Sequence, residues 1–177
     1  MRNPQVAGAS EWLRSVVDGY EGPLIRYAAR ITGDAERARD VVQDTFLRLC
    51  EQDRQQLDGR LAEWLYTVCR RRALDVKRKE HRMRATLPEE LDRCACNAPS
   101  NDSLECDEAH AAVLAVLGRL PENQQEVVRL KFQAGLSYRE IAAVTGLSVT
   151  NVGYLLHVAL KKVREEMLGE ASKGKAE

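Results

Sequence analysis

The chain has 177 residues, with 27 Lys and Arg balanced by 27 Asp and Glu, so its formal net charge at neutral pH is zero. Such a length suits one ordinary domain or two small ones. Few aromatic and many charged residues favour modest helical cores over a β-sandwich. A neutral chain suits nucleic-acid binding only if its basic residues are gathered in one place. Here residues 70–84 carry eight basic side chains against two acidic ones.

No apolar run approaches the roughly 18 residues that span a bilayer, and the N-terminus lacks the basic-then-apolar order of a signal peptide. The sequence therefore predicts a cytoplasmic protein without membrane insertion. Five cysteines, an odd number without a framework spacing, fit a reducing compartment. Cys50 and Cys69 fall within helical patterns and are expected to be buried as small hydrophobic residues.

The first part of the chain is expected to be helical after a loose end over residues 1–9. Apolar spacing predicts one helix over 11–22, a second over 23–33, and a third that Asp34 caps. The third helix is predicted to bury Ala38, Val41, Val42, Thr45, Phe46 and Leu49. Its outer face is predicted to hold Asp40, Gln43, Asp44, Leu47 and Arg48. From periodicity alone, an acidic face of this kind is usually just solvated.

A polar loop over 52–59 precedes a fourth predicted helix, from Leu61 to about Arg82, which carries the basic cluster. Cationic side chains track phosphates, and aromatic side chains stack on unpaired bases. Trp64 and Tyr66 lie just before the cluster, so this helix suits a DNA strand that has been opened. The alternative is that both aromatic residues belong to the core and the arginines form a solvated face.

Residues 85–108 break the periodicity and have the composition of a flexible linker. The sequence therefore predicts an all-α fold of two small helical domains, over 10–84 and 109–168, joined by this linker. A C-x-C…C-x-x-x-H set lies within or beside it and consists of Cys94, Cys96, Cys106 and His110. Its spacing matches no common zinc site. No metal or cofactor is predicted, while metal binding and redox sensing by these residues stay open.

The second domain ends in two helices that suit a helix-turn-helix. Ser137 and Glu140 form a capping box, Gly146 ends the first helix, and Ser148 caps the second. The second helix is predicted to bury a stripe of Val149, Val152, Leu156, Ala159 and Val163. At about 100° per residue, the opposite side presents Thr150, Tyr154, His157 and Lys161, with Asn151 at its edge. Such a helix can enter the DNA major groove. The alternative is an ordinary helical hairpin.

Two separated stretches, in the expected order, resemble one protein family. The first contains the segment DVVQDTF and the second the segment LSYREIA. They are similar to region 2 and region 4 of the extracytoplasmic-function (ECF) sigma factors of bacterial RNA polymerase. Residues 10–84 correspond to region 2, residues 109–168 to region 4, and residues 85–108 to the linker between them. The resemblance implies a protein that binds polymerase core, recognises promoter DNA and helps to melt it.

The resemblance also implies a use for each surface. In the family, the third helix docks on the clamp helices of the polymerase β′ subunit, which makes Asp40, Gln43, Asp44 and Arg48 the predicted core-binding residues. The next loop captures an extruded base of the minus-ten element. Contacts to that element are predicted for Trp64, Arg70, Arg71, Arg78 and Lys79. The second domain binds the β flap and places its last helix in the minus-thirty-five element. Contacts there are predicted for Arg139, Ser148, Thr150, Asn151, Tyr154, His157 and Lys161.

The chain departs from the family's pattern in three places. Its last helix has uncharged, mostly apolar residues where the family commonly carries Lys and Arg: Gly153, Leu155, Val158 and Leu160. We therefore expect weaker phosphate contacts there. Arg71 stands where the family commonly has Asn, and Cys50 where it commonly has Trp. An apolar last helix also suits a protein partner, such as an anti-sigma factor that hides the DNA-facing side.

The sequence predicts a sigma factor that is not an enzyme, because no nucleophile–base set, Gly-rich phosphate loop or paired-carboxylate motif stands out. Two alternatives stay open. One is a sigma-like DNA-binding regulator that does not act through polymerase core. The other is a protein-interaction module whose apolar last helix binds a partner rather than DNA.

Overall fold

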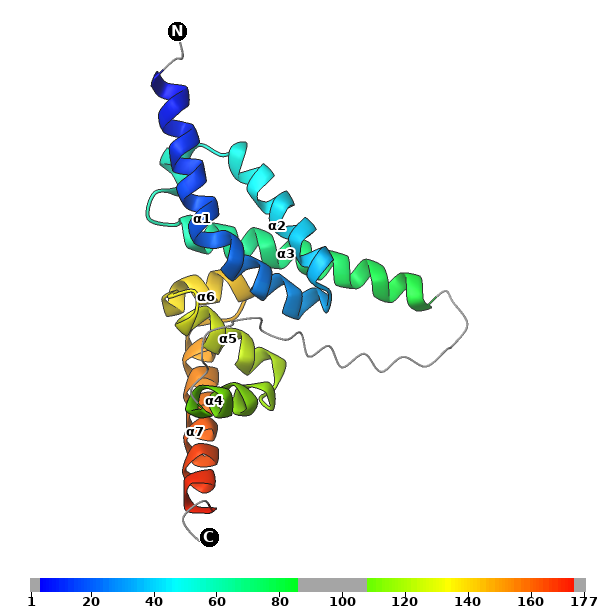
Figure 1. Ribbon diagram of the computed structural model, residues 1–177, viewed down its shortest axis with the longest axis vertical. Helices are drawn as coiled ribbons and strands as arrows, with labels where there is room; N and C mark the ends of the chain where they lie inside the picture. The colour runs from blue at the N-terminus through cyan, green and yellow to red at the C-terminus, as the bar shows by residue number, and fades with distance from the viewer. Residues whose placement is uncertain (1–3, 86–107, 174–177) are drawn as a thin grey trace. The chain divides into compact units, whose positions relative to one another are not determined.

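The computed structural model describes residues 4–85 and 108–173, and all regular structure in these ranges is helical. The predicted all-α fold is therefore confirmed. The chain divides into two compact units, residues 1–100 and 101–177, and each is described by itself (Figure 1). The predicted linker lies almost entirely outside the described residues.

The N-terminal unit consists of three helices and one short 3-10 turn. Their bounds are α1 Pro4–Thr32, α2 Ala35–Cys50, η1 Arg54–Leu57 and α3 Leu61–Ala85. The three α-helices contact one another pairwise. Their shared core is apolar and includes Leu24, Ala28, Val42, Leu49, Leu65 and Cys69, all at most 2% exposed. Because α2 packs on both neighbours, only one of its sides is left on the surface.

The predicted break near Pro23 is wrong, because α1 runs through it as one helix (Figure 1). The predicted loose end is also wrong in part, since this helix begins at Pro4. A proline inside a helix loses one hydrogen bond and costs about 3 kcal/mol. The turns that follow bury Leu24, Tyr27 and Ala28, and full burial of one large apolar side chain contributes about 1.5–3 kcal/mol. Tertiary packing therefore overrides the local signal.

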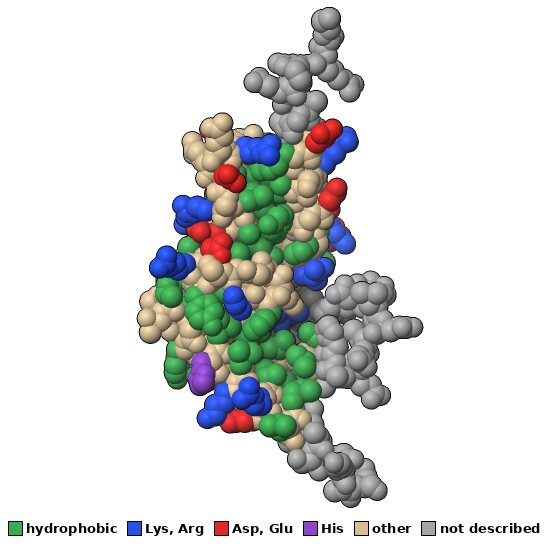
Figure 2. Space-filling model, turned by 90° about the vertical axis from the view of Figure 1, so that its left-hand side faces the viewer, with side chains coloured by type: hydrophobic (Ala, Val, Ile, Leu, Met, Phe, Trp, Pro, Cys, Tyr) green, Lys and Arg blue, Asp and Glu red, His purple; other side chains and the backbone are tan. Residues whose placement is uncertain are grey.

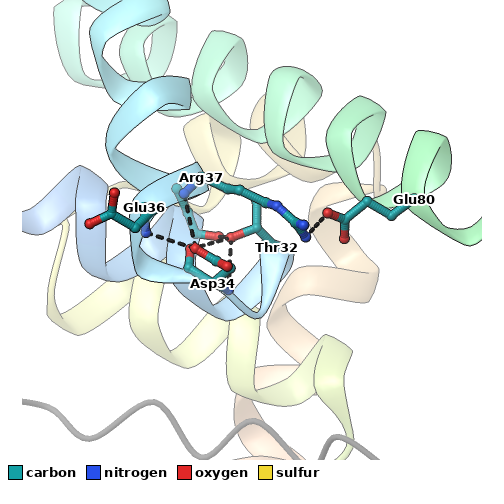
Figure 3. Close-up of polar contacts among 6 residues, drawn as sticks. Thr32, Asp34, Glu36, Arg37 and Glu80 are labelled. Atoms are coloured by element: carbon teal, nitrogen blue, oxygen red, sulfur yellow. Dashed lines mark hydrogen bonds and ion pairs between the residues drawn. The ribbon is translucent and has the colours of Figure 1, made fainter. Parts of the chain in front are cut away.

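The turn between α1 and α2 is fixed by local hydrogen bonds (Figure 3). Asp34 caps α2 as predicted: its Oδ1 accepts from the backbone N–H of Glu36 at 2.8 Å and of Arg37 at 3.1 Å. The Thr32 hydroxyl lies 3.0 Å from the Asp34 carbonyl oxygen and braces the same turn. The Arg37 N–H bond is the main cause that lowers the pKa of Asp34. The stabilisation that the ionised Asp34 side chain gives the fold is complete above the ordinary pKa of 3.8. It is lost as the pH falls through the lowered pKa.

The segment before α3 is anchored at several points. Asp53 caps the 3-10 turn η1, and Leu57 is buried beneath it. The Arg54 guanidinium lies 5.3 Å from the centre of the Trp12 ring on α1, a cation–π contact. The polar side chains of this loop are exposed. The predicted base-capturing loop is therefore a supported structure rather than an open coil.

The C-terminal unit has four helices: α4 Glu108–Gly118, α5 Glu122–Phe132, α6 Tyr138–Thr145 and α7 Val149–Lys173. Helix α7 contacts each of the other three. Gln125 at the start of α5 donates its side-chain N–H to the carbonyls of Gly118, at 3.1 Å, and Leu120, at 2.8 Å. These bonds satisfy carbonyls that the end of α4 leaves without helical partners.

Helices α6 and α7 form the predicted helix-turn-helix. The capping box is present: the Ser137 N–H donates to Glu140 at 2.6 Å, and the Glu140 N–H donates to the Ser137 hydroxyl at 3.3 Å. Gly146 ends α6 with a left-handed φ of 77°, and the Ser148 hydroxyl accepts from the Asn151 N–H at 3.2 Å. The axes bend by 104°, which lies in the range of helix-turn-helix motifs.

By length and hydropathy, none of the described helices could cross a membrane alone; α6 and α7 meet both criteria only together, as this bent pair.

One member of the predicted stripe on α7 is wrong. Val149 is 45% exposed, because it begins the helix beyond the reach of the core. Leu155 is buried in addition to Val152, Leu156 and Ala159. The buried face of α7 is therefore shifted toward Leu155.

Gly146→Ala is expected to lower the free energy of unfolding by about 1 kcal/mol, because a Cβ is disfavoured in the left-handed conformation. The space around Gly146 is open, so the loss comes from the backbone and not from a clash. Urea denaturation followed by circular dichroism measures it. Gly118→Ala is the control, since Gly118 also faces open space but has no positive φ. Equal losses in both variants would contradict the explanation.

Candidate functional site

The outer face of α2 carries the residues predicted to bind polymerase. Asp40, Gln43 and Arg48 are exposed and Asp44 is half-buried. Helical spacing places Leu47 between them, and its side chain is 65% exposed. The sequence placed Leu47 outward without assigning it a role. A large apolar side chain at the centre of a polar face is a typical anchor for a protein contact.

Two ion pairs join α2 to α3 along this side. Asp44 Oδ2 contacts the Arg72 guanidinium, with 43% and 38% of the two side chains exposed. Arg37 contacts Glu80 in the same way, with the charges reversed between the helices (Figure 3). Sequence reasoning missed both pairs, since no local pattern links residues on different helices, and even the nearer pair, Asp44 and Arg72, lies 28 positions apart.

Three of the predicted minus-ten contacts share one side of α3. Trp64, Arg71 and Arg78 recur at steps of seven, so they align along the helix over about 21 Å. Trp64 is half-buried, whereas Arg71 and Arg78 are exposed. Asp75 lies on the same side, 3.7 Å from the Arg78 guanidinium. We call Trp64, Arg71 and Arg78, with Asp75 among them, the α3 stripe.

The other two predicted minus-ten contacts lie beside the α3 stripe. Lys79 is exposed on the flank nearer to Arg72, and Arg70 is half-buried on the opposite flank, about 100° from Arg71. The structure therefore does not bring all five residues onto one narrow surface. A strand that follows the stripe would meet Arg71 and Arg78 first.

Tyr66 belongs to the core. It is 3% exposed, and its ring meets that of Tyr27 edge-on, with centroids 5.2 Å apart. Burial raises the pKa of its hydroxyl to about 12. Of the two aromatic residues that precede the basic cluster, the core interpretation holds for Tyr66, while Trp64 stays within reach of a ligand.

The residues predicted to contact the minus-thirty-five element lie on the outward side of α7, except for Arg139 on α6 and Ser148 in the turn before α7. All of the following are exposed: Arg139, Ser148, Thr150, Asn151, Tyr154, His157 and Lys161. Tyr154 is 65% exposed. Lys161 lies 3.8 Å from Glu165, which reduces the charge it offers to a phosphate.

The apolar residues of α7 have different uses. Leu155 is buried, and Gly153 packs against the ring of Tyr138 from α6. Leu160 is 46% exposed and shares a helix side with Val149. Apolar side chains thus reach the surface of the C-terminal unit beside basic ones, as the lower half of Figure 2 shows. We call Tyr138, Val149 and Leu160 the apolar patch; the sequence analysis did not assign Tyr138 or Val149 to it.

Cys69 is fully buried as expected, whereas Cys50 is exposed at the end of α2, so that expectation is wrong. The core ends with Leu49, and the next residue already faces outward. Burial raises the pKa of the Cys69 thiol to about 12. Cys94, Cys96 and Cys106 lie outside the described residues, as does the side chain of His110.

Iodoacetamide at pH 8 is expected to alkylate Cys50 in the native protein and to spare Cys69. With a pKa of about 12, only about one Cys69 thiol in ten thousand is ionised at that pH. Peptide mapping by mass spectrometry measures both sites, and urea-unfolded protein gives the full extent of reaction. Equal labelling of the two residues in native protein would contradict the burial of Cys69.

Two family models match this chain. Sigma-70 region 2 matches residues 16–83, and Sigma-70 region 4 matches residues 110–163. The chain is 32% identical to the ECF RNA polymerase sigma factor EcfG of Rhodopseudomonas palustris, over 80% of this chain and 77% of EcfG. It is 29% identical to ECF sigma factor SigL of Mycobacterium tuberculosis, over 89% and 90% of the two chains. With SigE of Mycolicibacterium smegmatis it is 30% identical, over 84% of this chain and 59% of SigE.

Two solved structures share the fold. CnrH, solved in complex with the cytosolic domain of CnrY, aligns over 92% of both chains with a TM-score of 0.57 and 24% identity. The sigma factor RpoE of Bartonella quintana, solved with the anti-sigma factor NepR, aligns over 90% of this chain and 96% of its own, with a TM-score of 0.57 and 21% identity.

Proposed function

The chain belongs to the extracytoplasmic-function family of RNA polymerase sigma factors, and we propose that it acts through three surfaces, one each on α2, α3 and α7. As a sigma factor it binds RNA polymerase and promoter DNA and directs transcription initiation. The exposure of the predicted site residues is the observation that supports this assignment of surfaces. Residues that the resemblance assigns to ligands lie on the outer sides of these helices, whereas the remaining sides form the cores.

The α2 face is proposed to bind the β′ clamp helices of polymerase core. Exposed Leu47 supplies apolar contact area, and the surrounding Asp40, Gln43 and Asp44 supply carboxylates and an amide for a basic or polar partner. A central apolar anchor within a polar rim is the usual composition of a protein interface. The proposal therefore rests on chemistry as well as on family membership.

The α3 stripe is proposed to follow the backbone of the opened minus-ten strand. Arg71 and Arg78 offer charge to phosphates, and Trp64 offers an edge or face to an unstacked base. Extruding a base costs a few kcal/mol, which these contacts and the anchored η1 loop would offset. An ordered loop loses less conformational entropy on binding than a free one.

The outward side of α7 is proposed to enter the major groove of the minus-thirty-five element. Hydroxyl, amide and imidazole groups there suit hydrogen bonds to base edges. Lys161 shares its charge with Glu165, so phosphate attraction should be modest. Because both units belong to one chain, binding of either raises the effective concentration of the other. The protein would act in the cytoplasm, where polymerase works, and would contribute no bond chemistry of its own.

The apolar patch supports a second proposed interaction, with an anti-sigma factor. RpoE of Bartonella quintana was solved with the anti-sigma factor NepR. In this chain Tyr138, Val149 and Leu160 are each between 44% and 46% exposed. A partner that covered the apolar patch would hide the adjacent start of α7, the end that would meet base edges.

Run-off transcription with purified polymerase core tests the surfaces separately. Asp40→Arg removes no ion pair or hydrogen bond among the described contacts, so it should leave the fold intact. Because it reverses a charge on the α2 face, it is expected to weaken binding to polymerase core at least tenfold and to abolish transcripts. Tyr154→Ala is expected to keep core affinity but weaken transcription from promoters that need the minus-thirty-five element. Binding to core is measured by fluorescence anisotropy.

The two variants separate the surfaces, because Asp40→Arg should change both core affinity and transcription, whereas Tyr154→Ala should change transcription alone. Normal core affinity in Asp40→Arg would contradict the proposed α2 face. If Tyr154→Ala left transcription unchanged on every promoter that wild type uses, the proposed role of the α7 surface would be wrong.

The α3 stripe predicts a difference between neighbouring cations. In the holoenzyme, Arg78→Ala is expected to slow promoter opening and to reduce the salt dependence of binding to a single-stranded minus-ten segment by about 0.7 in log–log slope per lost phosphate contact. Lys77→Ala is the control, since Lys77 is exposed but lies outside the α3 stripe, about 100° around the helix from Arg78 and on the flank that holds Arg70. Opening is followed by permanganate reactivity of unpaired thymines. Equal effects of the two substitutions would argue against a defined stripe.

A further inference from the structure

Asp44 differs from the other residues proposed to bind polymerase. Of Asp40, Gln43, Asp44 and Arg48, it alone forms an ion pair with another described residue, Arg72 of α3. We infer that Arg72 is a positioning residue, which holds the Asp44 carboxylate in the orientation that polymerase binds. This inference rests on the proposed role of the α2 face.

The contact leaves room for a second partner. Arg72 Nη2 meets Asp44 Oδ2, and none of the described contacts involves the other oxygen, Oδ1. A carboxylate can accept several hydrogen bonds across its two oxygens. With 43% of its side chain exposed, Asp44 can keep Arg72 on one oxygen and accept a donor from polymerase on the other.

The benefit to binding is conformational. A surface Asp without a partner samples several rotamers, and a protein partner must select one of them. Holding the side chain in its bound orientation removes part of that entropic cost, which corresponds to about threefold to tenfold in affinity for one side chain. A half-exposed ion pair adds little to folding stability. Loss of the pair can therefore change the affinity for polymerase core without changing the stability of the protein.

The helix that carries Arg72 connects this contact with the proposed DNA-binding surface. Arg72 belongs to α3, whose outward side carries the α3 stripe, so the proposed DNA-binding helix supplies the residue that orients the polymerase-binding carboxylate. Lys79, a predicted minus-ten contact, lies on the same flank of α3, seven residues on. A single edge of α3 thus connects the two proposed binding surfaces of the N-terminal unit.

The second ion pair provides a matched control. Arg37 and Glu80 join the same two helices (Figure 3), yet neither residue belongs to a proposed binding surface. Loss of this pair reproduces any general loosening of α2 against α3 without changing the orientation of Asp44. Arg37→Gln therefore separates positioning from packing.

The test measures the Kd of the full chain for purified polymerase core, together with the melting temperature of each variant. Arg72→Gln is expected to raise Kd about threefold to tenfold, and Arg72→Lys to restore most of the affinity because the contact uses a single nitrogen. Arg37→Gln should stay within about twofold of wild type. In an Asp44→Asn background, Arg72→Gln should have no further effect, because a positioning residue acts only through the residue it positions.

The possible outcomes distinguish the positioning role of Arg72 from the proposed polymerase-binding role of the α2 face. If Asp44→Asn weakens core binding but Arg72→Gln does not, the inference is wrong and the α2 face stands. Additive effects of the two substitutions would also overturn it, since Arg72 would then act independently. Equal losses in Arg72→Gln and Arg37→Gln would assign the effect to packing. If Asp44→Asn binds core normally, Asp44 has no role in the proposed α2 face and the inference fails with it.

Discussion

Burial of one side of α2 against α1 and α3 is the constraint on which the N-terminal unit depends. Ala38, Val41, Val42 and Leu49, the apolar side chains that meet there, are at most 3% exposed. Because both neighbouring helices press on the same side, the opposite one is exposed whatever residues it carries. Asp40, Gln43 or Leu47 can therefore be substituted during evolution to suit a binding partner, with little loss of folding stability. The fold separates the residues that maintain stability from those proposed to recognise polymerase.

The C-terminal unit depends on a different constraint, the geometry of one turn. Gly146 in the left-handed region ends α6, and the hydroxyl groups of Ser137 and Ser148 cap the two helices around it. These local features set the 104° bend. The bend allows α7 to pack on three helices with one side while its first turns stay open to a groove. The backbone conformation of this turn thus decides which side chains of α7 can reach a groove.

Local signals were predictable from the sequence, and long-range ones were not. Capping residues such as Asp34 and Ser137 lie within three positions of the groups they bond, so their patterns can be read directly. Pro23 misled the prediction, because burial of the following turn decides whether a helix continues. Trp64 and Tyr66 have similar chemistry, and only the packing of Tyr66 on Tyr27 distinguishes them. The pairing of Asp44 with Arg72 joins two helices and has no local pattern at all.

The position of Asp75 within the α3 stripe affects how firmly this unit can hold a nucleic-acid strand. A phosphate that approaches Arg78 must compete with a carboxylate already 3.7 Å from the guanidinium, and it is repelled by that carboxylate as well. The stripe therefore attracts a strand less than its two arginines alone would. An acidic residue among the arginines would keep capture of a strand reversible, so the surface proposed to bind opened DNA would also limit how long it holds the strand.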